Sequence, residues 1–341
     1  MKKIIVSLLI ILVLSALFIA WKILGPTVNA PEGKYLYIRS NHNMDSLKQT
    51  LIQEKILSST FYFDRVRNIS RVNFKNVKPG RYKIEDGSNL IDLIRKLKRG
   101  QQEPVRFVIN KLRTKEDLAS RIGRNFECDS TQAMQYLLNN DSLKKWNLDT
   151  NTVMTAVIPN TYLLHWNGSF TQILNRLKQE QEKFWNEERL AQAQQLKLTP
   201  VQVYTLASIV EEETNKKEDK GKIASVYLNR YRKGMKLQAD PTVKYALRGF
   251  DIKRVYHKHL TVASPYNTYY ATGLPPGPIC TPSPQTIDEV LNTPETPYLF
   301  FVAKPTFDGF SNFAKDYNEH MKFARAYQKA LDSLMQSKQS K

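Results

Sequence analysis

The first apolar stretch of the chain is long and free of charge. Residues 4–21 contain no charged side chain, and extension to Leu24 gives about 31 Å of helix, enough to span a bilayer. Lys2 and Lys3 precede the stretch, so the positive-inside rule predicts a cytoplasmic N-terminus and an exported remainder. The sequence Val-Asn-Ala at 28–30 resembles a signal-peptide cleavage site, but the length of the apolar run favours an uncleaved anchor.

Short alternating and helical patterns follow the predicted anchor. They predict a small α/β module built from strands at 35–38 and 80–84, helices at 44–54 and 89–97, and a further apolar piece at 61–66. Gly100 is expected to close the second helix. A module of this size outside the membrane suits a binding unit, a spacer or a purely structural neck.

The middle of the chain is mainly helical. Its pattern predicts a strand at 105–109, amphipathic helices at 114–124 and 131–139, and a proline turn at 157–162. Residues 170–198 are rich in Gln, Glu and Lys and predict one long, solvated connecting helix. No chemistry is assigned to this part.

A helix beginning after Pro200 carries the most informative pattern. At about 100° per residue its apolar residues fall on one stripe, formed by Val203, Leu206, Ile209 and Val210. Glu213 lands within that stripe, whereas Glu211 and Glu212 point to its flanks. A carboxyl group that a helix directs towards its apolar face has a raised pKa, which suits a general acid. The alternative is a solvated end of a surface helix.

The loops that follow are dense in Pro, Gly, Asn, Thr and Tyr. They surround a second amphipathic helix at 222–232, which ends at Gly234, and a run at 298–303 that predicts a buried strand. Aromatic rings combined with amides and hydroxyls suit a polysaccharide groove. Rigid surface loops are the alternative interpretation.

Length, net charge and the numbers of cysteines and histidines limit which molecules the chain is expected to bind. The chain has 341 residues, enough for two or three modules, and a formal net charge of +19 spread along its length. An exported basic chain meets anionic lipids and wall polymers rather than nucleic acid. Its two cysteines, Cys128 and Cys280, imply no disulfide framework and leave a single bridge undecided. The five histidines form no metal-binding pattern, so we expect neither metal nor cofactor.

Five motifs, in this order along the chain, are similar to those of one protein family: residues 206–214, Asn229-Arg230, 237–242, 264–269 and 273–277. Together they closely resemble the endolytic murein transglycosylases, membrane-anchored enzymes that cut nascent peptidoglycan strands. The resemblance extends to the N-terminal anchor, to residues 159–162, and to residues 78–82 in a module similar to LysM wall-binding domains. In that family the second Glu of a Glu-x-Glu-Thr motif is the essential acid. It corresponds to Glu213, the residue that the helical phase selects separately.

The chain departs from the family pattern at three positions. Asn160 stands where the family often has Asp, and Glu212 stands where it often has Lys, so we expect a more negative local field. Ser311 occupies a position where His is common, although His320 fits a later family position.

The resemblance implies an α+β fold in four parts: an anchor at 1–25, a LysM-like module at 33–103, an intermediate region at 104–198 and a catalytic core at 199–335. It implies a lyase reaction that forms 1,6-anhydro ends, on strands near the peptidoglycan synthases at the outer side of the cytoplasmic membrane. Glu213 is the expected acid and base, with Glu211 as the alternative acid. The expected substrate-binding residues are Asn229, Arg230, Gln238, Asp240, Thr242, Tyr266, Asn267 and Thr268. A hydrolytic muramidase and a non-catalytic wall-binding scaffold remain alternatives.

Overall fold

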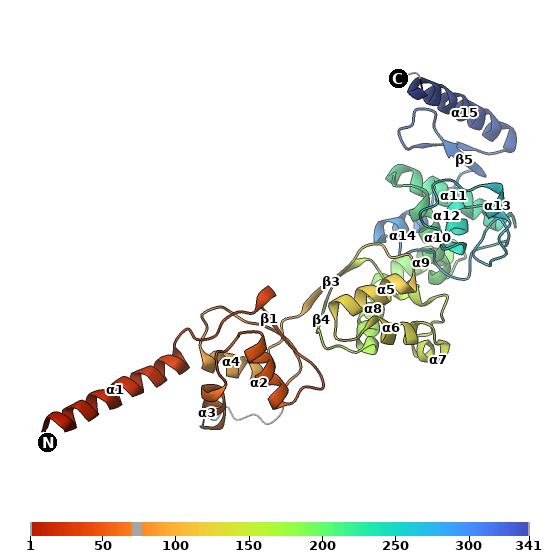
Figure 1. Cartoon of the computed structure of the whole chain (residues 1–341). Helices are drawn as coiled ribbons and strands as arrows, with labels where there is room; N and C mark the ends of the chain where they lie inside the picture. The colour runs from red at the N-terminus through yellow and green to blue at the C-terminus, as the bar shows by residue number, and fades with distance from the viewer. Residues whose placement is uncertain (1, 70–76, 340–341) are drawn as a thin grey trace. The chain divides into compact units, whose positions relative to one another are not determined.

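The computed structural model describes residues 2–69 and 77–339, which form two compact units. The first unit contains residues Met1–Phe107, Asn125–Cys128 and Leu163–Ser169; the second contains Val108–Arg124, Asp129–Tyr162 and Phe170–Lys341. Helices dominate both, and the strands within the described ranges pair two by two (Figure 1). The predicted α+β class is confirmed, while the finer division into four parts stays a prediction.

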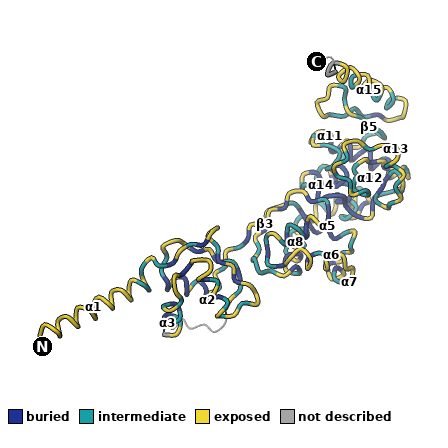
Figure 2. The backbone as a smooth tube through the Cα atoms, viewed as in Figure 1, coloured by how far each residue is buried: buried dark blue, intermediate teal, exposed yellow. Residues whose placement is uncertain are grey.

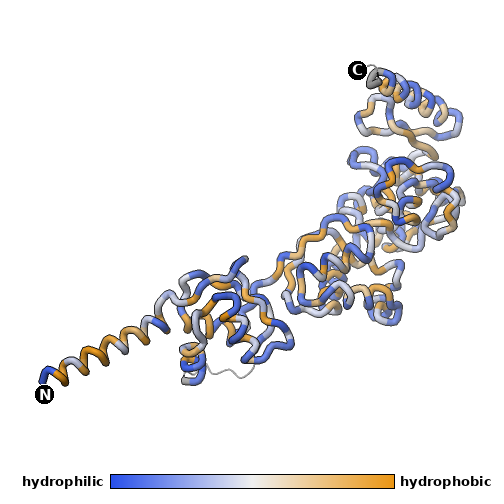
Figure 3. The backbone as a smooth tube through the Cα atoms, viewed as in Figure 1, coloured by the Kyte–Doolittle hydropathy of each residue, from blue (hydrophilic) through white to orange (hydrophobic). Residues whose placement is uncertain are grey.

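Helix α1 (Lys2–Leu24) has no buried residue and is apolar almost throughout (Figures 2 and 3). Among the described residues it is the one helix that is long and apolar enough to cross a membrane. A soluble protein would not leave such a surface in water, because its burial is strongly favourable. The helix therefore has the length and composition of the predicted anchor.

The first unit is built on a two-stranded antiparallel sheet. Strand β1 (Tyr35–Ile38) pairs with β2 (Gly80–Lys83), with Tyr35 opposite Lys83 and Ile38 opposite Gly80. The elements around this sheet are a 3-10 turn (Glu32–Lys34), α2 (Met44–Gln53) and α3 (Phe61–Ile69) between the strands, and α4 (Leu90–Arg99) after them. Both predicted strands and helices are confirmed, and the apolar piece at 61–66 is helical. The similarity to LysM domains stays a prediction.

Helix α4 shows how local sequence sets the boundaries of an element. The Asn89 side chain accepts a hydrogen bond from the Asp92 N–H at 2.8 Å, which caps the first turn. Gly100 ends the helix in the left-handed region at φ 69°, a conformation that glycine adopts without strain. The four apolar residues at helical spacing, Leu90, Leu93, Ile94 and Leu97, are buried.

The segment after the anchor is part of the core of the first unit. Val28 is 0% exposed and packs among the core side chains. Its N–H donates to the Ser88 carbonyl at 3.0 Å, and its own carbonyl accepts from the Gly87 N–H at 2.9 Å. Cleavage after Ala30 would remove this residue from the folded unit, which argues for retention of the anchor.

A pair of truncations tests this role of Val28. A chain that begins at Pro31 is expected to have a first unit about 3 kcal/mol less stable than a chain that begins at Pro26. The lost valine burial contributes about 2 kcal/mol and its backbone hydrogen bonds about 1 kcal/mol. Hydrogen exchange of the β2 amides measures the difference, with both chains lacking α1. Equal protection in the two chains would contradict the assignment.

The second unit is mainly helical and carries the remaining elements, except that the strands at 105–109 and 160–164 and the helix at 115–125 have residues in both units. Its helices are α5 (Lys115–Asn125), α6 (Ser130–Leu137), α7 (Asn140–Leu143), α8 (Phe170–Phe184), α9 (Glu187–Gln195), α10 (Pro200–Glu213), α11 (Lys217–Arg232), α12 (Asp240–Ala246), α13 (His257–Leu260), α14 (Pro284–Leu291) and α15 (Tyr317–Gln339), with 3-10 turns at Lys144–Trp146 and Val153–Ala156. Strand β3 (Val105–Ile109) pairs with β4 (Asn160–Leu164), and β5 (Phe300–Ala303) pairs antiparallel with β6 (Ser311–Ala314).

Three sequence predictions in this unit need correction. The expected single helix over 170–198 is broken into α8 and α9, because Asn186 leaves the helical conformation and its side chain caps α9 by accepting from the Arg189 N–H at 3.0 Å. The run expected to be a buried strand is the short strand β5, whose residues are half-buried or exposed because it has one partner strand. Helix α11 also begins earlier than expected, at Lys217.

Helix α10 is the centre of the second unit. A capping box formed by Thr199 and Gln202 begins the helix, with Pro200 in its first turn. Every residue from Val203 to Val210 is buried, because α9, α11, α12 and α14 pack around it. The sequence predicted one apolar face on this helix, whereas the structure buries all of its faces from Val203 to Val210. Its first turn and its acidic C-terminal turn are half-buried.

Candidate active site

The three glutamates that end α10 diverge in direction and have different partners. Glu213 faces α11, Glu212 faces the segment between β3 and α5, and Glu211 faces α14. The side chains are half-buried. One acidic run therefore produces three carboxyl groups with different chemistry.

Glu213 has the pKa expected of a general acid. Burial raises its pKa from 4.5 to about 7, and the charges of Asp240 and Glu212 act in the same direction. A hydrogen bond from the Tyr227 hydroxyl to Oε1, at 2.6 Å, and the charge of Lys244 oppose the shift. The negative end of the α10 dipole also disfavours the ionised form. Near neutral pH this carboxyl group can both donate and accept a proton.

Glu212 is ionised and tied to two cations. Nε and Nη2 of Arg113 donate to its two oxygens at 3.2 and 3.0 Å, and the Lys111 ammonium lies 2.9 Å from Oε1. Burial raises the pKa of Glu212, but these contacts outweigh burial and hold it below its usual value. The more negative field expected from the sequence is therefore largely neutralised by Lys111 and Arg113.

Glu211 belongs to a polar cluster on the opposite flank. Its Oε2 accepts hydrogen bonds from Lys220 at 2.9 Å, Ser283 at 3.2 Å and Thr286. Burial raises its pKa. The hydrogen bonds from Thr286 and Lys220 and the charge of Lys220 lower the pKa by more than burial raises it, so the net shift is a decrease. A carboxylate that is ionised and fully engaged is poorly suited to donate a proton. This arrangement favours Glu213 over Glu211 as the acid.

Two of the expected substrate-binding residues donate hydrogen bonds to backbone carbonyls of the segment just before β5. Asn229 donates to the carbonyls of Thr296 and Tyr298 at 2.8 and 3.0 Å. Arg230 is 8% exposed and donates from Nε to the Leu299 carbonyl at 2.7 Å and from Nη1 to the Leu237 carbonyl at 2.8 Å. Their observed contacts are intramolecular, and a role in substrate binding stays a prediction.

Four further candidates lie just before α12, within α12 and in the loop around residue 268. Thr242 and Thr268 are buried with their hydroxyls 2.9 Å apart, and the Thr268 carbonyl accepts from the Gln238 N–H at 3.1 Å. Gln238 is exposed, in the left-handed region at φ 53°. Asn267, which is 0% exposed, donates to the carbonyls of Leu260 and Val262. These contacts fix the shape of the loops.

Asp240 and Tyr266 lie nearer to solvent. The exposed Asp240 carboxylate accepts from the Tyr269 hydroxyl at 2.7 Å and influences the pKa of Glu213. Tyr266 is half-buried, packs on Tyr245 with ring centroids 4.8 Å apart, and donates to Asn151. Of the predicted set, Asp240 is the one whose charge acts directly on the proposed acid.

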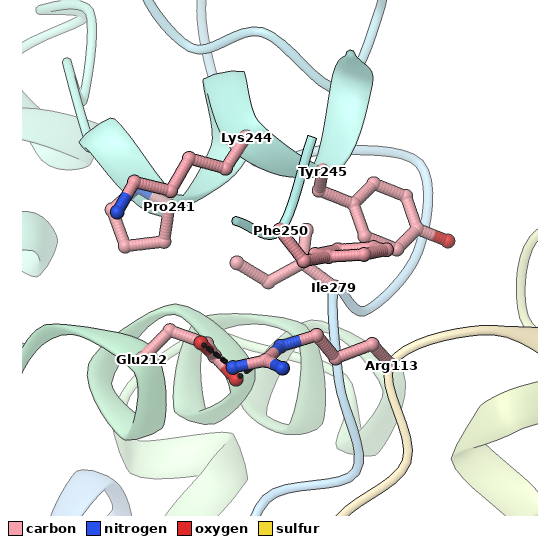
Figure 4. A pocket seen from close by; sticks show the side chains of 7 residues that line it. All are labelled: Arg113, Glu212, Pro241, Lys244, Tyr245, Phe250 and Ile279. Carbon is pink, nitrogen blue, oxygen red and sulfur yellow. Dashed lines mark hydrogen bonds and ion pairs between the residues drawn. The ribbon is translucent and has the colours of Figure 1, made fainter. Parts of the chain in front are cut away.

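Two pockets border the acidic turn, and several of their residues were not identified from sequence. One, of about 60 Å³, lies between α10 and α12 and is lined by Arg113, Glu212, Pro241, Lys244, Tyr245, Phe250 and Ile279 (Figure 4). The other, of about 400 Å³, is lined on its polar side by Asn110, Lys111, Asn160, Thr161, Glu211 and Ser283. Glu212 pairs with Arg113 of the first pocket and Lys111 of the second. These residues come from segments that are far apart in the sequence, so no local sequence pattern predicts that they line the same pockets.

Removing the Tyr227 hydroxyl tests its influence on the acid. Because its hydrogen bond lowers the pKa of Glu213, Tyr227→Phe is expected to raise that pKa above its wild-type value of about 7. Titration of ¹³C-labelled glutamate carboxyl groups by NMR measures the change. An unchanged or lower pKa would show that this hydrogen bond does not stabilise the ionised form.

Proteins of similar sequence include two endolytic murein transglycosylases. Over 131 residues the chain is 44% identical to the endolytic murein transglycosylase of Bacillus subtilis strain 168, covering 38% of this chain and 36% of that protein. Over 325 residues it is 24% identical to the endolytic murein transglycosylase of Streptococcus pneumoniae D39, covering 86% of this chain and 57% of the relative. The chain thus matches less than two thirds of either relative's length.

A solved structure and a family model extend the similarity to most of the chain. The crystal structure of a YceG-like protein from Listeria monocytogenes aligns with a TM-score of 0.52 and 26% identity, covering 84% of this chain and 98% of that one. The model of the YceG-like family matches residues 36–326. The resemblance inferred from the sequence motifs is confirmed, and the chain belongs to the YceG-like family.

Proposed function

We propose that this chain is an endolytic lytic transglycosylase that cuts nascent peptidoglycan between N-acetylmuramic acid and N-acetylglucosamine. The observation that carries the proposal is Glu213, a half-buried carboxyl group with a pKa of about 7 in contact with Tyr227. The names of the two curated relatives support the same activity. Cleavage inside a strand ends its elongation.

One carboxyl group is sufficient for the reaction. Protonated Glu213 donates its proton to the glycosidic oxygen, and the bond to muramic C1 breaks through an oxocarbenium-like state. The resulting carboxylate then takes the proton of the muramic C6 hydroxyl while that oxygen bonds to C1. The products are a free N-acetylglucosamine hydroxyl and a 1,6-anhydro ring. The proton returns to Glu213 and no water is consumed.

The proposed location follows from α1 and the first unit. Lys2 and Lys3 support a cytoplasmic N-terminus by the positive-inside rule, which would put the two units on the outer side of the membrane. The burial of Val28 supports retention of the anchor. A LysM-like first unit would hold glycan close to the membrane, where synthases extrude new strands.

A hydrolytic muramidase is the second candidate, and Asp240 favours it. The charge of Asp240 raises the pKa of Glu213, so a second carboxylate acts on the acid. Hydrolysis of a glycosidic bond commonly uses two carboxyl groups, one as the acid and one to activate water or stabilise the sugar cation. The hydrogen bond from Tyr269 gives Asp240 a defined orientation.

Mass spectrometry of the strand ends separates the candidates. Purified protein is incubated with uncrosslinked glycan strands, and the new ends are compared before and after chemical reduction. Lytic transglycosylation gives ends that are lighter by one water and resist reduction, whereas hydrolysis gives reducible ends. Salt-sensitive binding without new ends would overturn both and leave a wall-binding scaffold.

A further inference from the structure

The small pocket between the end of α10 and α12 is positively charged and adjacent to the proposed acid. Figure 4 shows Lys244 on the α12 side of this pocket and the Arg113–Glu212 pair on the α10 side. Glu212 precedes Glu213 directly, and the charge of Lys244 lowers the pKa of Glu213. A group bound here would therefore lie beside the reacting bond.

Lys244 has no ion-pair or hydrogen-bond partner in the part of the chain that the structure describes. The nearest carboxylate on the same helix, Asp240, accepts instead from the Tyr269 hydroxyl. Lys244 is half-buried. An ammonium in this position gains most from an anionic ligand.

Arg113 adds a second, oriented cation. Glu212 holds its Nε and Nη2, and its guanidinium lies over the Phe250 ring at 5.4 Å. Within the described ranges Nη1 has no partner, so its donors are available to a ligand. Lys111 also pairs with Glu212, so one carboxylate is shared by two cations. The group formed by Lys111, Arg113 and Glu212 therefore has a net positive charge even before Lys244 is counted.

We propose that this pocket binds a carboxylate of the peptide stem attached to the muramic acid residue at the cleavage site. The inference rests on the proposed function and identifies what the site recognises besides sugar. The N-acetylated sugar rings are uncharged, whereas the stem carries free carboxylates. The pocket volume of about 60 Å³ is large enough for a carboxylate.

Stem recognition makes Lys244 and Arg113 specificity-determining residues. They add binding energy to strands whose stems carry free carboxylates and none to strands whose stem carboxylates have been converted to neutral amides. Their contacts with the stem are present before and during bond cleavage, so they lower KM and leave kcat nearly unchanged.

Binding to a catalytically impaired protein tests the proposal directly. The full-length Glu213→Gln chain in detergent is titrated with uncrosslinked strands whose stems keep their carboxylates and with the same strands after the stem carboxylates have been converted to neutral amides. Adding Lys244→Ala is expected to weaken binding of the carboxylate-bearing strands about 10-fold and of the amidated strands less than about 2-fold. Lys244→Arg restores binding. Lys258→Ala, an exposed lysine on α13, has no effect.

Equal loss for both strands, or no loss for either, would overturn the proposal. The active chain gives a second readout below about pH 6, where Glu213 is protonated with or without the charge of Lys244: Lys244→Ala raises KM for stem-bearing strands about 10-fold with kcat within about 2-fold. The failures are distinguishable. If the chain binds stems through Lys244 but cleaves neither strand, the proposed function is wrong and this inference stands. If it cleaves both strands equally well with or without Lys244, only this inference is wrong.

Discussion

Replacement of Glu213 by glutamine is expected to lower the rate of glycan cleavage by about 10³-fold. Glutamine has the same shape and still accepts a hydrogen bond from Tyr227, but it has no proton to donate and cannot act as a base. A single general acid–base residue typically contributes about 10²–10⁴-fold. The release of new strand ends from uncrosslinked glycan measures the rate.

The matched control is Glu218→Gln, an exposed glutamate in the first turn of α11. It makes the same chemical change within the second unit and is expected to keep wild-type activity. Circular dichroism and thermal unfolding should show that both variants fold. Wild-type turnover by a folded Glu213→Gln protein would remove Glu213 from the mechanism and leave Glu211 as the next candidate.

The second large effect is on stability, at Lys220. Lys220 and Glu211 form an ion pair at 2.9 Å, with side chains 11% and 17% exposed. Lys220→Met leaves a partly buried carboxylate without its cation, and we expect it to lower the free energy of unfolding by about 3–5 kcal/mol. Urea unfolding of the second unit measures the loss.

Two variants make this prediction specific. Adding Glu211→Gln to Lys220→Met should recover most of the loss, because a neutral side chain no longer needs the cation. Lys222→Met, two residues along the same helix at an exposed position, should change stability by less than about 0.5 kcal/mol. A small effect of Lys220→Met alone would show that water solvates the Glu211 carboxylate well enough to replace the lost ion pair.

The sequence was sufficient wherever local rules decide the outcome. Helix α4 has its cap at Asn89, its end at Gly100 and its apolar residues at helical spacing, so its bounds and its buried face were predictable. The phase of α10 placed Glu213 towards the protein interior in the same way, and the family motif selected the same residue. These predictions need only the neighbouring residues in the chain.

Long-range contacts could not be predicted. Arg113 and Glu212 are 99 residues apart, and only the fold brings a basic segment to the acidic turn. Thr242, Asn267 and Thr268 were chosen as polar groups in rigid loops, but the structure places them in buried hydrogen bonds. From sequence alone, a polar residue that supports a loop and one that faces a ligand have the same pattern.

The dependence of kcat/KM on pH tests most directly whether Glu213 is the acid. Because its pKa is about 7, the protonated form that donates to the glycosidic oxygen predominates below that pH. We predict that kcat/KM on uncrosslinked strands falls about tenfold per pH unit above about 7. A fall centred near 4.5, the ordinary value of a glutamate, or a rate that stays constant from about pH 6 to 9, would contradict the assignment.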